Sequence, residues 1–156
     1  MSKRVTHELT YDAPLADVRA MLLDEDFRTA VAKEQRALRS TVSVEGEAVR
    51  FETVQPAAGI PSFAKKFVGD EIVVVQQETW GATKADIHVT IPGKPGEMKG
   101  TATLRETGTG TTETVDLEVK VSIPLVGGKI EGLIADMLVK ALKAENRAGR
   151  AWLAKA

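Results

Sequence analysis

The chain has 156 residues, of which 43% are hydrophobic and 28% are charged, so its composition excludes a wholly disordered protein. Its 21 basic and 22 acidic side chains leave a formal net charge of -1, so we expect no nucleic-acid partner. The chain contains no cysteine, which excludes disulfides, thiolate catalysis and cysteine-ligated metal sites.

Alternating apolar and polar residues predict a first strand over residues 5–11, with His7 and Tyr11 on the same face as Leu9. Two short helices are expected after it. Asp12 can cap the first helix, which continues through residues 15–22, and Asp26 is the expected cap of the second, which extends to residue 34.

Strand patterns dominate the next eighty or so residues. Six strands are expected at residues 38–44, 49–54, 72–80, 85–91, 98–106 and 112–123. Short glycine-containing links at residues 92–96 and 107–111 favour antiparallel neighbours, because parallel crossovers need longer connections. The strands are therefore expected to form an antiparallel sheet.

A long amphipathic helix is predicted over residues 129–153, about 38 Å at 1.5 Å per residue. Its apolar stripe consists of Ile130, Leu133, Ile134, Met137, Leu138, Ala141, Leu142, Ala148 and Trp152. Together the elements predict an α+β fold in which this helix packs across a curved sheet.

The order of strand, two short helices, six antiparallel strands and a long C-terminal helix resembles the START-like, or SRPBCC, helix-grip superfamily. The opening segment, residues 5–14 (VTHELTYDAP), and the closing helix are similar to those of the actinobacterial family of unknown function DUF2505. In the wider superfamily the sheet wraps around the helix and leaves a cavity for lipids, sterols or polyketides. Some members are cyclases or hydrolases, and others only carry or sense ligands.

The interruption between Val54 and Asp70 matches the place where this superfamily has a mobile loop or short helix at the cavity mouth. Phe63 and Phe67 fall on one face of a helical pattern, with Lys65 pointing elsewhere. One interpretation is a lid whose lysines meet an acidic ligand head or a membrane surface. The other is a short helix that plugs the open end of the sheet.

The strand at residues 72–80 carries two polar residues in regular alternation with apolar ones. If Gln76 and Glu78 face the concave side, they are polar groups in an apolar chamber and need partners or a ligand. The opposite orientation puts Val73 and Val75 inside, and the sequence leaves this choice open.

Small residues on the strand that begins at Met98 can leave space above the sheet or permit close helix packing. His7 is interpreted either as a proton donor or ligand-orienting group or as a buried, hydrogen-bonded histidine. The ligand-binding candidates are His7, Tyr11, Phe51, Phe63, Phe67, Gln76, Glu78, Trp80, Met98 and Met137. No catalytic residue is assigned, and two histidines without cysteine predict neither a metal nor a cofactor.

The length predicts a single domain over residues 1–156. No signal-peptide pattern and no apolar window of about 18 residues is present, so we expect a cytoplasmic protein without integral membrane association. The leading functional hypothesis is a non-catalytic carrier or sensor of a small hydrophobic, lipid- or polyketide-like molecule. One alternative is a polyketide cyclase or hydrolase using His7, Tyr11 or Glu78, and another is a ligand-free protein-interaction domain. The sequence leaves the oligomeric state open.

Overall fold

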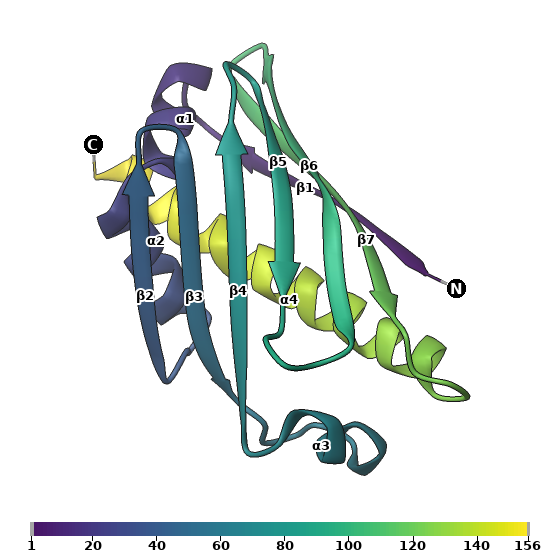
Figure 1. Cartoon of the computed structure of the whole chain (residues 1–156). Helices are drawn as coiled ribbons and strands as arrows, with labels where there is room; N and C mark the ends of the chain where they lie inside the picture. The colour runs from purple at the N-terminus through teal and green to yellow at the C-terminus, as the bar shows by residue number, and fades with distance from the viewer. Residues whose placement is uncertain (1, 156) are drawn as a thin grey trace.

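The computed structural model describes residues 2–155, which form one seven-stranded antiparallel sheet and four helices (Figure 1). The strands are β1 (Lys3–Tyr11), β2 (Arg39–Glu45), β3 (Ala48–Pro56), β4 (Glu71–Trp80), β5 (Lys84–Thr90), β6 (Gly96–Thr107) and β7 (Gly110–Val121). The helices are α1 (Leu15–Leu22), α2 (Glu25–Glu34), α3 (Ser62–Val68) and α4 (Gly127–Ala154). The predicted α+β helix-grip architecture is confirmed.

The strand order in the sheet is β1-β7-β6-β5-β4-β3-β2. From β2 to β7 each strand therefore pairs with its neighbour in sequence, and β1 pairs with β7. The hairpin between β6 and β7 closes through the pair Thr107 and Gly110. Gly108, inside this turn, has a φ of 51°, a left-handed conformation that glycine adopts without steric cost. Short turns of this kind produce the antiparallel order that the links predicted.

Helix α4 crosses one face of the sheet diagonally, and α1 and α2 lie at its C-terminal end (Figure 1). Its principal contacts are with β1, β7 and α2. α3 stands apart at the opposite end of the sheet, within the connection from β3 to β4 (Figure 1). The two ends of α4 therefore lie in different surroundings.

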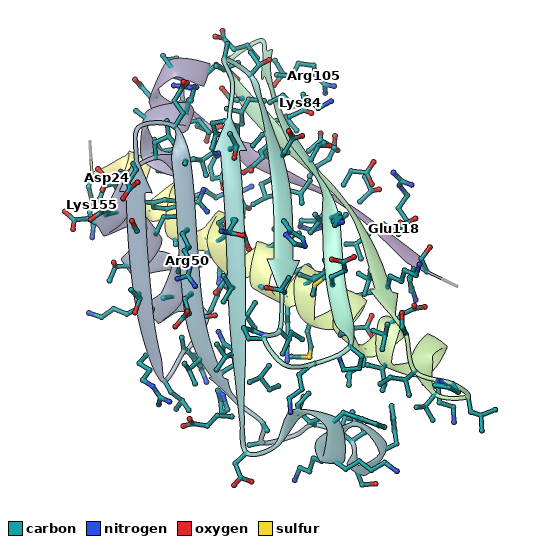
Figure 2. All side chains as sticks on the ribbon, in the orientation of Figure 1. Asp24, Arg50, Lys84, Arg105, Glu118 and Lys155 are labelled. Carbon is teal, nitrogen blue, oxygen red and sulfur yellow. The ribbon has the colours of Figure 1, made fainter. Side chains whose placement is uncertain are left out.

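The alternation of side chains along the strands separates a core face from a solvent face. On β7, Val115, Leu117 and Val119 point toward α4 and are buried. Charged side chains, Arg50 and Glu118 among them, project from the face turned away from the helix (Figure 2). One continuous hydrophobic core lies between α4 and the inner face of the sheet.

The helix starts differ in detail from the sequence predictions. Asp24, rather than Asp26, caps α2, because its side chain accepts hydrogen bonds from the backbone N–H groups of residues 26 and 27. Asp12 does not cap α1, whose N-cap position is Pro14 in an extended conformation. Candidate capping residues two positions apart are difficult to distinguish from sequence, because only the backbone geometry decides which one is half outside the helix.

Candidate ligand-binding site

The orientation of β4, which the sequence left open, places Gln76, Glu78 and Trp80 on the inner face of the sheet. Glu78 is only 4% exposed, whereas Gln77 and Thr79 are exposed on the outer face. Phe51 pairs with Gln76 across β3 and β4 and shares the inner face. A carboxyl group thus lies buried on the inner face of the sheet.

Glu78 is held by a set of donors from α2 and from its own strand. Arg28 of α2 donates from Nη2 to Glu78 Oε1 at 2.7 Å and from Nη1 to Oε2 at 3.2 Å, a bidentate pair. Trp80 donates from Nε1 to Oε1 at 2.8 Å, and the Gln76 amide donates to Oε2. Arg28 Nε donates to the backbone oxygen of Leu22 at 2.8 Å. Both oxygens of Glu78 are therefore occupied.

Two further glutamates are buried beside this pair. Glu145 of α4 places Oε1 3.6 Å from Arg28 Nη1, and Glu113 of β7 is 3% exposed. Glu113 Oε1 and the Oη of Tyr11 on β1 have no hydrogen-bond partner among the described residues. We call Arg28, Glu78, Glu113, Glu145 and Tyr11 the polar cluster.

Burial dominates the electrostatics of the cluster. Desolvation raises the pKa of Glu113 well above its ordinary range, and the nearby Glu145 and Glu78 add to the rise against the opposing effect of Arg28. Burial raises the pKa of Glu145 to about 7, because Arg28 offsets it only partly. Burial, and then the charges of Glu113 and Glu145, raise the pKa of Tyr11. The cluster therefore holds carboxylic protons near neutral pH.

The inner face is less completely covered between α3 and the polar cluster. Apolar residues there are only partly buried although they pack against the core; they are Val74, Ile91, Ile134 and Leu138. Along the inner face of β4, buried Ile72 at the α3 end is followed by half-buried Val74 and Gln76 and then by buried Glu78. An apolar, partly exposed surface thus leads to the polar cluster.

Helix α3 lies at this less covered end. Ala64 is buried, Phe63 and Phe67 are half-buried, and Lys65 is exposed. Lys129, in the first turn of α4, places its Nζ 6.0 Å from the centroid of the Phe63 ring, a cation–π contact between the two helices. Within the described chain α3 makes no extensive contact with another helix or strand.

The ten residues predicted from the sequence do not form one group. Gln76, Glu78 and Trp80 are joined by hydrogen bonds, and Tyr11 belongs to the same cluster. Buried Phe51 and Met98 lie on the inner face, whereas His7 and Met137 are half-buried on β1 and α4, and Phe63 and Phe67 lie on α3. His7 forms no hydrogen bond with Tyr11 or Glu78 within the described chain.

Sequence reasoning missed Arg28, Glu113 and Glu145, although each carried a signal. Glu113 has the same strand parity as Val115, and Glu145 fills the gap in the helical stripe between Leu142 and Ala148. Arg28 lies between apolar positions of α2. Charged residues on a predicted core face were therefore the signal for the cluster.

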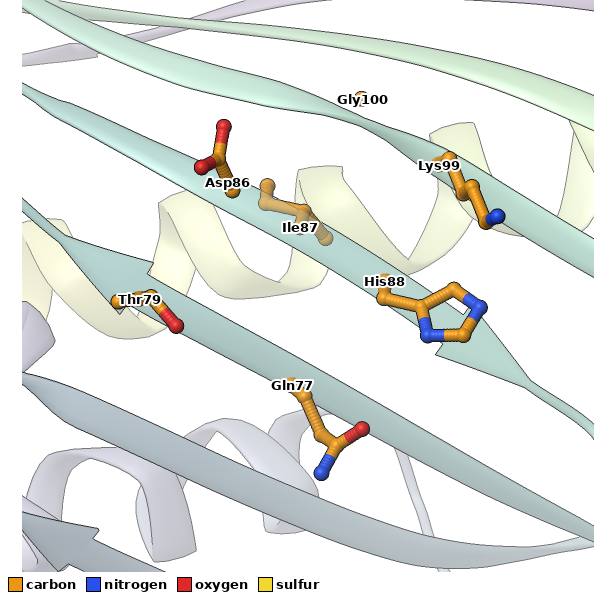
Figure 3. Close-up of a pocket in the computed structure, with 7 residues that line it drawn as sticks. All are labelled: Gln77, Thr79, Asp86, Ile87, His88, Lys99 and Gly100. Carbon is orange, nitrogen blue, oxygen red and sulfur yellow. The ribbon is translucent and has the colours of Figure 1, made fainter.

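Two open hollows lie elsewhere on the surface. One, of about 450 Å³, is on the outer face of β4, β5 and β6 and has α4 behind the strands (Figure 3). It is lined by Gln77, Thr79, Asp86, Ile87, His88, Lys99 and Gly100. The other, of about 440 Å³, lies where β7 joins α4. Neither is lined by any of the ten predicted residues.

Between residues 2 and 155, no helix combines the length and the apolarity that crossing a bilayer requires. Over the same range, no three or more His, Asp or Glu side chains gather in a way that could hold a metal ion.

Solved structures with the same fold cover nearly the whole chain at low sequence identity. TTHA0849 from Thermus thermophilus matches with a TM-score of 0.68 at 20% identity, over 96% of this chain and 98% of its own. The di-domain aromatase/cyclase StfQ from the steffimycin pathway matches with 0.70 at 10% identity, over 97% of this chain and 50% of its own. Norcoclaurine synthase from Thalictrum flavum matches with 0.69 at 14% identity, over 100% and 88%. At these identities the likeness concerns the fold alone.

Relatives by sequence have no described function. Uncharacterised proteins of Mycobacterium bovis and Mycobacterium tuberculosis are 31% identical over 102 residues, which is 60% of this chain. The match spans 58% of the length of those relatives. The model of the family described as "Protein of unknown function (DUF2505)" matches residues 6–153. The chain therefore belongs to the DUF2505 family.

Proposed function

We propose that the protein binds a small apolar molecule with a polar group, along the inner face of the sheet beneath α4. The observation that carries this proposal is the half-buried stretch of Val74 and Gln76 on β4, which adjoins buried Glu78. An apolar body would cover the partly exposed side chains, and a polar group would meet the cluster. Binding sites commonly combine an apolar lining with a few convergent polar groups in this way.

Covering partly exposed apolar surface is favourable by about 25 cal/mol per Å². The unpartnered oxygens of Tyr11 and Glu113 each carry a desolvation cost of about 1–3 kcal/mol. A ligand that contacts both regions would recover part of that cost. Carriage or sensing is favoured over catalysis because Glu78 is fully engaged by Arg28, Gln76 and Trp80.

The helix-grip fold shared with the aromatase/cyclase StfQ and norcoclaurine synthase is consistent with a lipid- or polyketide-like ligand. The chain would act as one domain, because its seven strands share one sheet and one core. A cytoplasmic location fits the lack of cysteine.

The test uses N-phenyl-1-naphthylamine, a neutral apolar dye that fluoresces when transferred out of water, with decanol as a competitor. Leu138→Trp fills the partly exposed face, and Leu38→Trp introduces the same bulk at a position that is 53% exposed. We expect saturable dye binding that decanol displaces, weakened at least about tenfold by Leu138→Trp and unchanged by Leu38→Trp.

Circular dichroism would confirm that both variants are folded. Absence of saturable dye binding to the wild-type protein would refute the proposal. Equal binding to the wild type and to Leu138→Trp would place the dye elsewhere and refute the proposed location.

Cyclase or hydrolase chemistry is the second candidate, and the free oxygens of Tyr11 and Glu113 favour it because neither is committed to a structural bond. A hydrolase would release 4-nitrophenol from 4-nitrophenyl decanoate. Glu113→Gln and Tyr11→Phe would then slow turnover without weakening dye binding. Turnover equal in wild type and both variants would exclude these residues from catalysis.

A further inference from the structure

The polar cluster contains more potential anions than cations. Its three carboxyl groups and the Arg28 guanidinium are each at most 6% exposed. Arg28 is the one buried lysine or arginine among residues 2–155, and its bidentate pairing commits it to Glu78. If all three carboxyl groups ionised, two negative charges would remain uncompensated in the interior. Buried charge of this kind is costly unless it is neutralised or paired.

Among the described residues, the elements packed around the cluster supply no second buried lysine or arginine. Arg150 of α4 is exposed and donates to the backbone oxygen and the hydroxyl of Thr10. β1 contributes Tyr11 and half-buried His7, and the amide of Asn146 on α4 donates to the backbone oxygen of Thr10. Arg19 of α1 is directed to Glu47 and to a backbone oxygen outside the cluster. The remaining neighbours on the inner face are apolar or, like Gln76, neutral.

Two oxygens of the cluster are free to accept hydrogen bonds. Glu113 Oε1 and Tyr11 Oη, in side chains that are 3% and 2% exposed, have no partner among the described residues. An ammonium group brings three donors and one positive charge. A carboxylate would instead add a fourth acidic group and no donor.

We propose that the ligand bound beneath α4 carries a protonated amine, which Glu113 and Glu145 receive as the cation that the cluster lacks. This inference rests on the binding function proposed above and specifies its ligand class. The amine would pair with ionised glutamates that otherwise keep their protons.

The protonation of the cluster supports a further expectation. Burial raises the pKa of Glu145 to about 7 and raises the pKa of Glu113 well above its ordinary range, so without a further cation these carboxyl groups favour the protonated form near pH 7. Arrival of a cation stabilises the ionised carboxylates and lowers both pKa values. Binding of an amine should therefore release protons, whereas binding of an alcohol should not.

The experiment compares three probes that share a decyl chain: decylamine, decanol and decanoic acid. Isothermal titration calorimetry at pH 7 in phosphate and in HEPES separates proton release from binding heat, because these buffers differ in ionisation enthalpy. Decylamine, protonated because alkyl amines have a pKa near 10, should bind at least about tenfold tighter than decanol. Decanoic acid should bind more weakly than decanol, and only decylamine should release protons.

Glu113→Gln and Glu145→Gln preserve side-chain shape and remove one ionisable group each. Each should reduce the preference for decylamine over decanol and reduce the proton release. The matched control is Glu97→Gln, because Glu97 contacts His88 on the outer face of the sheet. This substitution should leave the preference for decylamine and the proton release unchanged.

The outcomes separate this inference from the function on which it rests. If none of the three probes binds, the proposed function fails and the amine inference fails with it. If decanoic acid or decanol binds as tightly as decylamine, binding stands and the amine inference is overturned. A preference for decylamine that survives both glutamate variants would also overturn it, because the amine would then be recognised outside the cluster.

Discussion

The two halves of α4 have different neighbours. Its N-terminal half carries half-buried apolar residues, such as Ile134, and buries Glu131, which accepts a hydrogen bond from the backbone N–H of Val121. Its C-terminal half buries Glu145 beside Arg28. Soluble proteins usually bury apolar groups and expose charged ones. The closed end of the helix, near α1 and α2, is therefore organised around a buried charge cluster, while the open end, near α3, leaves apolar surface partly uncovered.

The largest predicted effect comes from removing the single buried cation of the closed end. Arg28→Met leaves Glu78, Glu113 and Glu145 without a positive partner, so we expect unfolding free energy to fall by about 3–5 kcal/mol at pH 7. Urea denaturation followed by circular dichroism measures the change. The loss should be smaller at pH 5, where carboxyl groups are more fully protonated.

Arg39→Met is the matched control, because Arg39 pairs bidentately with Glu71 at the surface. Exposed ion pairs are worth roughly 0–1 kcal/mol. Equal losses in the two variants would contradict the special role of the buried arginine.

The pH dependence of stability should also originate at the closed end. The pKa of Glu145 is about 7 in the folded protein against an ordinary value of 4.5, so between these values the folded state holds a proton that the unfolded state has released. The stability that Glu145 contributes through its raised pKa is fully present below pH 4.5 and is lost as the pH rises through about 7. Glu145 by itself should lower the free energy of unfolding by up to about 1.4 kcal/mol per pH unit, since it involves one proton.

Glu113, whose pKa is also raised, acts in the same direction. Urea denaturation at pH 5, 6 and 7 should show a falling stability that Glu145→Gln makes shallower. Glu97→Gln, at a position on the outer face, should leave the slope as it is. If Glu145→Gln leaves the change of unfolding free energy with pH unaltered, another group is responsible for that pH dependence.

Close packing at the closed end gives the next effect. A Cβ on Gly149 would lie 2.4 Å from Cε1 of Tyr11 and 3.2 Å from Cε of Met21. Gly149→Ala therefore forces these side chains to move, and we expect a loss of about 1–3 kcal/mol in unfolding free energy. The new methyl at Gly132, in the same helix, would approach only the Nζ of Lys3, at 3.9 Å.

Gly132→Ala should therefore stabilise the protein by up to about 1 kcal/mol, through the better helix propensity of alanine. Thermal and urea unfolding measure the change in unfolding free energy, which should be a loss for Gly149→Ala and a gain for Gly132→Ala. A stabilising Gly149→Ala would show that the interface between β1 and α4 is looser than this geometry requires.

Much of the fold was predictable from periodicity. Strand alternation and helical periodicity predicted the bounds of all seven strands and of α1, α2 and α4 to within a few residues. These patterns are informative because each element has one face in a continuous core. The site was less predictable. Gln76 and Glu78 could be identified as a polar pair, but their orientation depended on strand parity, which β3 and β5 determine through pairing.

The charge partner of Glu78 could not be predicted from local sequence. Arg28 lies 50 residues away, and Glu145 lies on the final helix. Only the packing of α2 and α4 against the sheet brings these residues together. The helical stripe, drawn from apolar residues alone, omitted Glu145 because buried carboxyl groups are uncommon.

The smallest predicted stability change tests whether α3 is a lid or a plug. Phe67 on α3 is half-buried, so Phe67→Ala should cost less than about 1 kcal/mol, whereas the same change at Phe27 of α2, which is 0% exposed, should cost about 3–5 kcal/mol. Urea denaturation of both variants measures the two costs. A loss at Phe67 equal to that at Phe27 would make α3 a structural plug. A small loss accompanied by altered dye binding would mean that α3 acts on the ligand rather than on the core.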